Sequence, residues 1–199
     1  DYVNKLVELR AKKGMTPEEA KKLLLNDPNF FGAMLIRMGD ADGMVSGSAS
    51  PTANVLRAGI QVIGTQPGVK TVSSVFIMEL TQFKDLFGSI LVFGDCSVIP
   101  FPTSEQLADI ATSAAETATK IAGINPRVAL MTFSTKGSAK HECVDRVKEA
   151  GSILRERKVQ FRFDDELQAD AALVKSVGEI KAPLSDVSGN AIVLIFPTL

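Results

Sequence analysis

The sequence contains few of the residues that build metal sites, disulfide frameworks or nucleic-acid surfaces. Its 199 residues include one histidine and two cysteines, Cys96 and Cys143. Neither cysteine has a second at metal-ligand spacing and two make no disulfide framework, so we expect free thiols and no bound metal. The formal net charge is -1, from 22 basic and 23 acidic side chains. The chain therefore lacks the excess of positive charge that is typical of a nucleic-acid-binding or polybasic membrane-surface protein.

Long apolar segments are also missing. No stretch approaches the roughly 20 consecutive apolar residues that a membrane-spanning helix needs. The first five residues, Asp1 to Lys5, have neither the basic region nor the apolar run of a signal peptide. These absences predict a cytoplasmic protein with neither a membrane nor a nucleic acid as partner. With 45% hydrophobic residues, the chain is long enough to bury the core of one large domain or two small ones.

Helical and strand patterns alternate along the chain. Thr16 with Glu19, and Thr103 with Gln106, have the spacing of capping boxes and predict the helices that follow them. Helices are expected at residues 16–25, 28–38, 51–63, 103–122, 140–157 and 167–177, and strands at 44–45, 72–80, 90–93, 128–133, 160–163 and 191–196. The strands at 72–80 and 90–93 lack strict alternation, which is typical of burial on both faces. This order predicts an α/β fold with a largely parallel sheet and flanking helices.

The loop from Ser46 to Thr52 is a candidate anion site. It joins a short predicted strand to a helix that Ser50 is expected to cap, and the free N–H groups of a helix N-terminus attract anions. Arg57 follows in the same helix, where a guanidinium can bind two phosphate oxygens at once. The candidate phosphate ligands are Ser46, Gly47, Ser48, Ser50, Thr52 and Arg57. The alternative is a well-capped surface helix with an ordinary solvated arginine.

Two further loops follow predicted strands. Ser134, Thr135 and Lys136 begin a loop that resembles half of a phosphate-binding loop but lacks the Walker spacing, which disfavours nucleotide hydrolysis. The alternative for this loop is a simple turn. Asp95 is either a base or acceptor that reaches a cleft, or a turn carboxylate that accepts hydrogen bonds from its own backbone.

The single histidine, His141, excludes a zinc site of several histidines. A Ser-His-Asp triad could use only His141, and no G-x-S-x-G elbow supports one. We therefore expect His141 to be a polar residue in the first turn of a helix, and Cys143 on that helix to be packed rather than nucleophilic. The absence of a G-x-G-x-x-G pattern disfavours a nicotinamide enzyme of the usual fingerprint.

Taken together, several short segments carry a family resemblance. They occur in this order: Gly39–Gly47, Thr52–Arg57, Val72–Phe76, Phe93–Cys96, Pro102–Ala108, Ser134–Ser138, Leu167–Ala172, Lys181–Pro183 and Ile195–Pro197. In this combination the chain resembles the phosphate acetyltransferase family, which includes the phosphate butyryltransferases. The resemblance implies an enzyme that interconverts acetyl-CoA plus phosphate with acetyl phosphate plus coenzyme A. It also implies that coenzyme A is a substrate and that no metal or tightly bound cofactor takes part.

The resemblance further implies an architecture of two α/β domains, similar to that of the isocitrate and isopropylmalate dehydrogenases. The active site would lie in the cleft between the domains, and a homodimer would form largely through the second. On this template residues 1–69 belong to the first domain and residues 70–199 to the second, with the Gln66–Gly68 turn near the boundary. Both domains would be incomplete, because the family has strands before residue 1 and a segment after Leu199.

The resemblance also assigns roles to residues. Phosphoryl binding falls to the Ser46–Thr52 loop and Arg57, and contacts to coenzyme A or the cleft are expected from Ser134, Thr135, Lys136 and Asp95. The family's catalytic aspartate lies beyond Leu199, so we expect no catalytic residue in this chain and no activity from it alone. The chain departs from common family residues at Ser50, Pro51, Ala58, Ile99, Asp165, Leu184 and Thr198. Two alternatives stay open: butyryl transfer, and an acetyl-CoA-sensing regulatory domain like that of malic enzymes.

Overall fold

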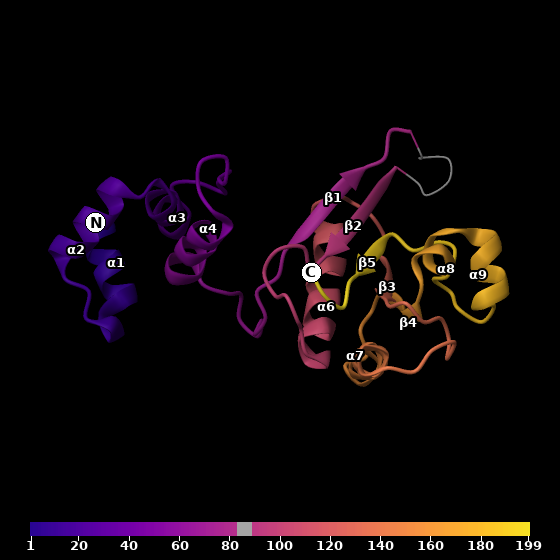
Figure 1. Cartoon of the computed structure of the whole chain (residues 1–199). Coiled ribbons are helices and arrows are strands. Elements are labelled where there is room, and N and C mark those ends of the chain that lie inside the picture. Colours follow the sequence, from indigo (N-terminus) through magenta and orange to yellow (C-terminus); the bar gives the residue numbers. More distant parts are fainter. Residues whose placement is uncertain (83–88) are drawn as a thin grey trace. The chain divides into compact units, whose positions relative to one another are not determined.

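The computed structural model describes residues 1–82 and 89–199 and divides into two compact units, Asp1–Gly68 and Val69–Leu199 (Figure 1). The first unit is helical. Its elements are α1 (Tyr2–Arg10), the 3-10 turn η1 (Ala11–Lys13), α2 (Pro17–Asn26), α3 (Pro28–Met38), α4 (Thr52–Ala58) and the π-helical turn η2 (Gly59–Ile63). Its core is formed by Leu6, Ala20, Leu24, Phe30, Ala33, Met34, Ala58 and Val62.

Local capping explains where these helices begin. The Thr16 hydroxyl accepts the backbone N–H of Glu19, and the Glu19 carboxylate accepts that of Thr16, so the predicted capping box is confirmed. Asp27 caps α3 by accepting the N–H groups of Asn29 and Phe30. These side chains satisfy backbone donors that the first helical turn leaves without partners.

The short strand predicted at residues 44–45 is wrong. Met44 and Val45 lie in irregular backbone, and the Val45 side chain is fully exposed. The Met44 side chain packs against α3 at Gly32, where a Cβ atom would lie 2.9 Å from the Met44 sulfur. The apolar character of Met44 therefore reflects packing on a helix and not pairing in a sheet.

The second unit contains a five-stranded sheet. Its strands are β1 (Val75–Glu79), β2 (Ile90–Gly94), β3 (Arg127–Met131), β4 (Arg162–Leu167) and β5 (Val193–Ile195). The strand order is β1-β2-β5-β3-β4, with β1 antiparallel to β2 and the other pairs parallel. The α/β fold with a largely parallel sheet is thus confirmed.

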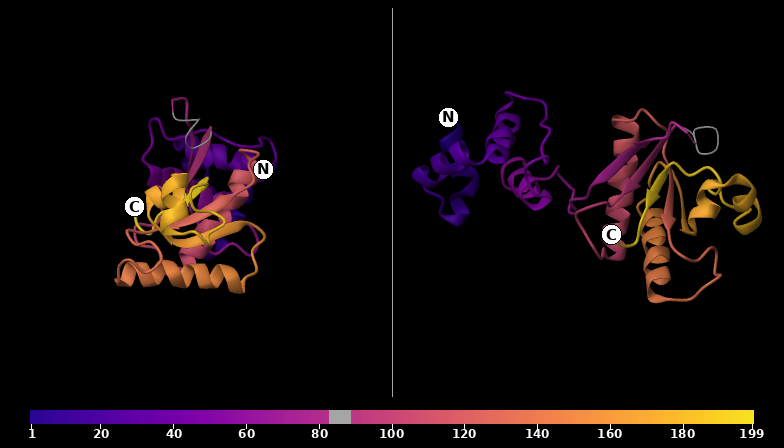
Figure 2. Two further views of the ribbon diagram at one scale, coloured as in Figure 1. Left: turned by 90° about the vertical axis from the view of Figure 1, so that its right-hand side faces the viewer. Right: turned by 45° about the horizontal axis from the view of Figure 1, so that its top comes forward.

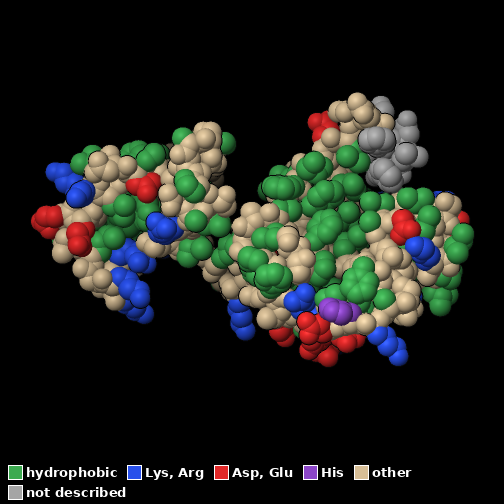
Figure 3. Space-filling view, in the orientation of Figure 1, with side chains coloured by type: hydrophobic (Ala, Val, Ile, Leu, Met, Phe, Trp, Pro, Cys, Tyr) green, Lys and Arg blue, Asp and Glu red, His purple; other side chains and the backbone are tan. Residues whose placement is uncertain are grey.

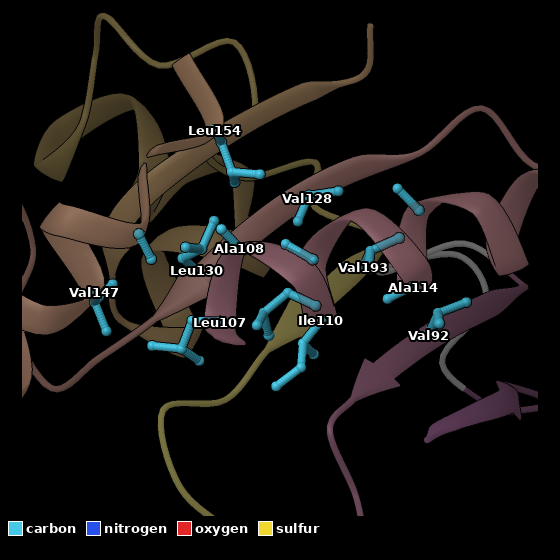
Figure 4. Packing of buried hydrophobic residues seen from close by; sticks show 14 of the residues in the cluster. Val92, Leu107, Ala108, Ile110, Ala114, Val128, Leu130, Val147, Leu154 and Val193 are labelled. Carbon is cyan, nitrogen blue, oxygen red and sulfur yellow. The ribbon is translucent and has the colours of Figure 1, made fainter. Parts of the chain in front are cut away.

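Helices cover both faces of this sheet. Val128 and Leu130 share a core with α6 (Ser104–Lys120) and α7 (Glu142–Glu156), while Ala129 and Met131 point to the opposite face, toward α8 (Ala169–Leu173) and α9 (Lys175–Lys181). Figure 4 shows side chains of the first cluster, and Figure 2 shows α6 and α7 on one side of the sheet. The absence of strict alternation in the central strands follows, because both faces are buried.

The strand at 72–80 does not follow this rule. In the structure it is the edge strand β1, where Phe76, Ile77 and Met78 are 53%, 42% and 41% exposed. It has a neighbouring strand on one side only, so its apolar run does not mean burial on both faces. The segment between the two strands includes residues 83–88, which lie outside the described range.

Three predicted boundaries also differ. The strand expected at 160–163 begins at Arg162 and continues to Leu167, and the helix expected at 167–177 is split into α8 and α9 by the extended backbone of Val174. The helix expected at 51–63 ends as α4 at Ala58 and continues as the π-helical turn. In the part of the chain described, no helix is both long and apolar enough to cross a membrane.

Candidate functional site

One buried amide binds two serines of the candidate phosphate loop. The Ser46 hydroxyl donates to Asn29 Oδ1 over 2.5 Å, and Asn29 Nδ2 donates to the Ser50 hydroxyl over 3.1 Å. Asn29 is 5% exposed. The capping role predicted for Ser50 is wrong, because Pro51 occupies the N-cap position of α4 without a side-chain bond and the Ser50 hydroxyl accepts from Asn29 instead. The loop geometry therefore depends on α3 as well as on α4.

The middle of this loop is open to solvent. Gly47 and Ser48 are exposed, and Gly47 has φ 121°, a backbone conformation that favours glycine. Thr52 and Arg57 are exposed on α4. Among residues 1–82 and 89–199, no carboxylate lies within ion-pair distance of the Arg57 guanidinium. A guanidinium without a carboxylate partner can bind an anionic ligand without first breaking an ion pair.

The second candidate loop, Ser134–Ser138, is closed onto the end of β4. Ser134 is fully buried and its hydroxyl donates to Glu166 Oε1 over 2.8 Å. The Thr135 hydroxyl accepts the N–H of Gln168 over 3.0 Å. These two hydroxyls are thus engaged within the protein and shape the loop.

Lys136 is also engaged. Its ammonium donates to Asp164 Oδ1 over 2.5 Å and to the backbone oxygen of Asp165 over 2.9 Å. Beside it lies a hollow of about 340 Å³, which Lys136, Asp164, Lys181 and residues 182–185 line. Lys181 pairs with Asp170 over 2.8 Å, and this hydrogen bond lowers the pKa of the Asp170 carboxyl. Each lysine of the hollow has a carboxylate partner, whereas the described residues offer none to Arg57.

Asp95 accepts hydrogen bonds from the turn that follows β2 and from Ser74, which directly precedes β1. Its Oδ1 accepts the N–H groups of Ser74 and Cys96 over 2.9 and 2.7 Å, and its Oδ2 accepts that of Ile99 over 2.7 Å. Burial raises the pKa of Asp95, but the hydrogen bonds from Ser74 and from backbone N–H groups outweigh it, so the pKa lies below its usual range. This geometry favours the turn carboxylate over a proton-accepting base.

We expect Asp95→Asn to lower the free energy of unfolding by about 1–3 kcal/mol at pH 7, because an amide nitrogen would face backbone donors. The folded pKa is depressed, so the carboxylate stabilises the fold above the pKa of the unfolded chain and loses this effect as pH falls through the folded pKa. The difference from the parent should therefore shrink on acidification, as measured by urea unfolding. The exposed Asp42→Asn serves as the control, and an equal effect of both variants at pH 7 would refute the assignment.

His141 is the N-cap residue of α7. Its Nδ1 accepts the N–H of Cys143 over 3.2 Å and lies 3.1 Å from the Cys143 sulfur. The prediction of a polar residue at the start of a helix is confirmed, and a helix-capping role accounts for this side chain. Among the residues that the structure covers, no group of three or more His, Cys, Asp and Glu side chains could hold a metal ion.

Two residues that hold these loops in place, Asn29 on α3 and Glu166 on β4, were not predicted from the sequence. Asn29 stands directly after an Asp-Pro helix start, where it has the pattern of an ordinary first-turn residue. Glu166 lies 32 residues after Ser134, its hydrogen-bond partner. It is the last of three consecutive acidic residues, Asp164, Asp165 and Glu166, so no local signal in the sequence set it apart as a buried carboxylate.

The fold and these loops define an α/β protein in which one unit carries an exposed arginine on the helix after a small-residue loop, and the other carries a hydroxyl-rich loop at a strand end. The family described as "Phosphate acetyl/butaryl transferase" matches residues 1–199, and the chain belongs to this family. The chain is 48% identical over 198 residues to the phosphate acetyltransferase of Thermoanaerobacterium thermosaccharolyticum, and 47% to that of Clostridium acetobutylicum. Both alignments cover the whole chain but only 60% and 59% of these relatives.

Solved structures of similar proteins share the fold of this chain. A phosphotransacetylase from Streptococcus pyogenes superimposes with a TM-score of 0.88 at 44% identity, over the whole chain and 58% of that structure. A branched-chain phosphotransacylase from Enterococcus faecalis, at 20% identity and a TM-score of 0.63, shares the fold over 85% of the chain and 59% of that structure. The chain thus spans 58–60% of the length of the two relatives and of these two solved structures.

Proposed function

We propose that the complete protein carrying this chain transfers an acetyl group between coenzyme A and inorganic phosphate, interconverting acetyl-CoA plus phosphate and acetyl phosphate plus coenzyme A. The names of its relatives, phosphate acetyltransferases at 42–48% identity, support an enzyme of this type. Coenzyme A takes part as a substrate and not as a bound cofactor. The relatives named here favour acetyl over butyryl transfer.

The observation that carries the proposal is the exposed guanidinium of Arg57, which has no carboxylate within ion-pair distance among the described residues and follows the Gly47–Ser48 segment in the same unit. Phosphate has to be held as a nucleophile beside the thioester carbonyl, so fixed donors and positive charge supply most of the acceleration. Arg57 would bind phosphoryl oxygens, and the Gly47 backbone with the Ser48 and Thr52 hydroxyls would add donors. The remaining loop hydroxyls, those of Ser46 and Ser50, would hold the loop through Asn29.

The second unit would supply contacts to coenzyme A. We assign these contacts to the Ser134–Ser138 loop with Lys136, and we assign Asp95 to the shape of the neighbouring turn. Residues 1–69 would form part of a first α/β domain and residues 70–199 a second, in the architecture of the isocitrate and isopropylmalate dehydrogenases. Two observations support the assignment of coenzyme A contacts to the second unit. The loop follows a parallel strand, β3, and hydrogen bonds close it onto β4.

We further propose a cytoplasmic homodimer that forms through the second unit. The exposed side chains of Phe76 and Met78 alternate along β1, opposite Phe93 and Leu91 of β2, so they share one face of the sheet. Figure 3 shows hydrophobic side chains gathered over this region. Exposed apolar patches of this kind are typical of protein–protein interfaces.

Met78→Lys tests this interface in the complete protein. A lysine on the apolar face should weaken the dimer, because its charge would be buried on association. Sedimentation velocity is expected to show a dimer for the parent and mainly monomer for the variant. Ile121→Lys, on an exposed side chain beyond α6, is the control and should remain dimeric. A parent that sediments as a monomer would contradict the proposal.

A direct assay tests the proposed activity. The complete protein, mixed with coenzyme A and either acetyl or butyryl phosphate, should form thioester faster from the acetyl substrate. The 199-residue chain, run in parallel, is expected to form none, because it spans only 60% of the length of the Thermoanaerobacterium thermosaccharolyticum enzyme. Binding of acetyl-CoA without any turnover by the complete protein would favour the regulatory domain instead.

A further inference from the structure

Glu166 is a buried charged residue with an unusual backbone conformation. It is 4% exposed and has φ 54°, in the left-handed region that side chains other than glycine seldom adopt. It lies in the last part of β4, one residue before the buried Leu167. A buried carboxylate in a strained backbone is costly, so the surrounding structure must fix it firmly.

Among the described residues, the hydrogen bonds that the Glu166 side chain accepts all come from the Ser134–Ser138 loop. Its Oε1 accepts the hydroxyl of Ser134 over 2.8 Å and the backbone N–H of Gly137 over 2.5 Å. Its backbone oxygen accepts the N–H of Lys136 over 3.2 Å. Side chain and backbone of Glu166 therefore hold the beginning, middle and end of one tight turn.

From these contacts we infer that Glu166 is the positioning residue of the Ser134–Ser138 loop, and that it presents this loop for contact with coenzyme A. The second part of the inference rests on the function proposed above. Glu166 does not touch substrate in this role. It sets the conformation of the loop, in which Lys136 and Gly137 have φ 47° and 90°.

The geometry indicates that Glu166 sets the loop conformation through its hydrogen bonds and not through its charge. Both side-chain bonds end on Oε1, while Oε2 has one distant cation, the half-exposed Lys148 at 3.8 Å. A glutamine can keep its oxygen at the Oε1 position and accept both hydrogens. An alanine removes the acceptor and leaves the Gly137 N–H without its partner, yet retains a Cβ atom and hence the same backbone strain.

The test compares three variants of the complete protein. Glu166→Ala is expected to raise KM for coenzyme A about ten- to a hundredfold with a smaller change in kcat, because a loop displaced by about 1 Å binds its ligand poorly. Glu166→Gln should restore KM to within about threefold of the parent. Lys148→Gln, which removes only the distant charge, should change KM by less than about twofold. An equal defect in Glu166→Gln and Glu166→Ala, or no defect in either, would overturn the inference.

Hydrogen exchange separates this inference from the proposed function. The Gly137 amide of the parent should exchange slowly, and Glu166→Ala should accelerate its exchange by about tenfold or more while amides of β3 stay protected. Faster exchange without a change in KM would retain Glu166 as the positioning residue and refute the coenzyme A contact. Rapid exchange of Gly137 in the parent itself would overturn the positioning role, even if Glu166→Ala failed to fold.

Discussion

Replacing Arg57 by alanine in the complete protein is expected to slow acetyl transfer by about 10²–10³-fold, with an increase in KM for phosphate. The reason is that Arg57 is an exposed guanidinium with no carboxylate in ion-pair range among the described residues. Its charge is therefore available to the phosphoryl oxygens as charge develops on them. Steady-state rates at varied phosphate concentration measure both effects.

Two variants separate binding geometry from charge. Arg57→Lys keeps the positive charge but not the planar pair of donors, so it should recover only part of the rate. Arg37→Ala removes an exposed guanidinium of the same unit, which donates a hydrogen bond to the Ile63 backbone oxygen, and should leave the rate within about twofold. If Arg57→Ala and Arg37→Ala behave alike, Arg57 is an ordinary surface arginine.

Gly189→Ala is expected to destabilise the second unit by about 3 kcal/mol or more. The residue has φ 69°, and a Cβ atom there would lie 2.5 Å from the Cα atom of Lys175 at the start of α9. The clash is with backbone, so it cannot be relieved by rotating a side chain, and overpacking adds to the strain of the left-handed conformation. Equilibrium unfolding in urea measures the loss.

Gly123→Ala is a matched control for this substitution. Gly123 has nearly the same φ, 67°, but a Cβ atom at this position would meet nothing within 4 Å. It should therefore report the conformational strain alone, about 1–2 kcal/mol. Equal losses in the two variants would mean that α9 can move away from Gly189, contrary to the close approach seen here.

Local signals predicted much of the fold. The capping boxes at Thr16 and Thr103 fix the starts of α2 and α6, because both partners of each box lie within four consecutive residues. The central strands were also predicted, since burial on both faces leaves an apolar run in the sequence. β1 has the same kind of run but lies at the edge of the sheet, and composition does not distinguish these positions.

The candidate site was less predictable. The sequence indicated the two loops, but not the residues that hold them. Asn29 contacts Ser46, 17 residues later, and Glu166 contacts Ser134, 32 residues earlier. Such pairs leave no periodic pattern, so only the folded chain brings them together. The helix cap predicted at Ser50 failed for the same reason, because a distant amide engaged its hydroxyl.

The release of coenzyme A from acetyl-CoA by the complete protein tests the proposed transfer most directly. With acetyl-CoA present, thiol release should require inorganic phosphate, saturate as phosphate increases, and match the acetyl phosphate formed one to one. Thiol release that is independent of phosphate would indicate hydrolysis of the thioester and contradict a phosphoryl site at Arg57. The absence of release at any phosphate concentration would contradict the transferase itself.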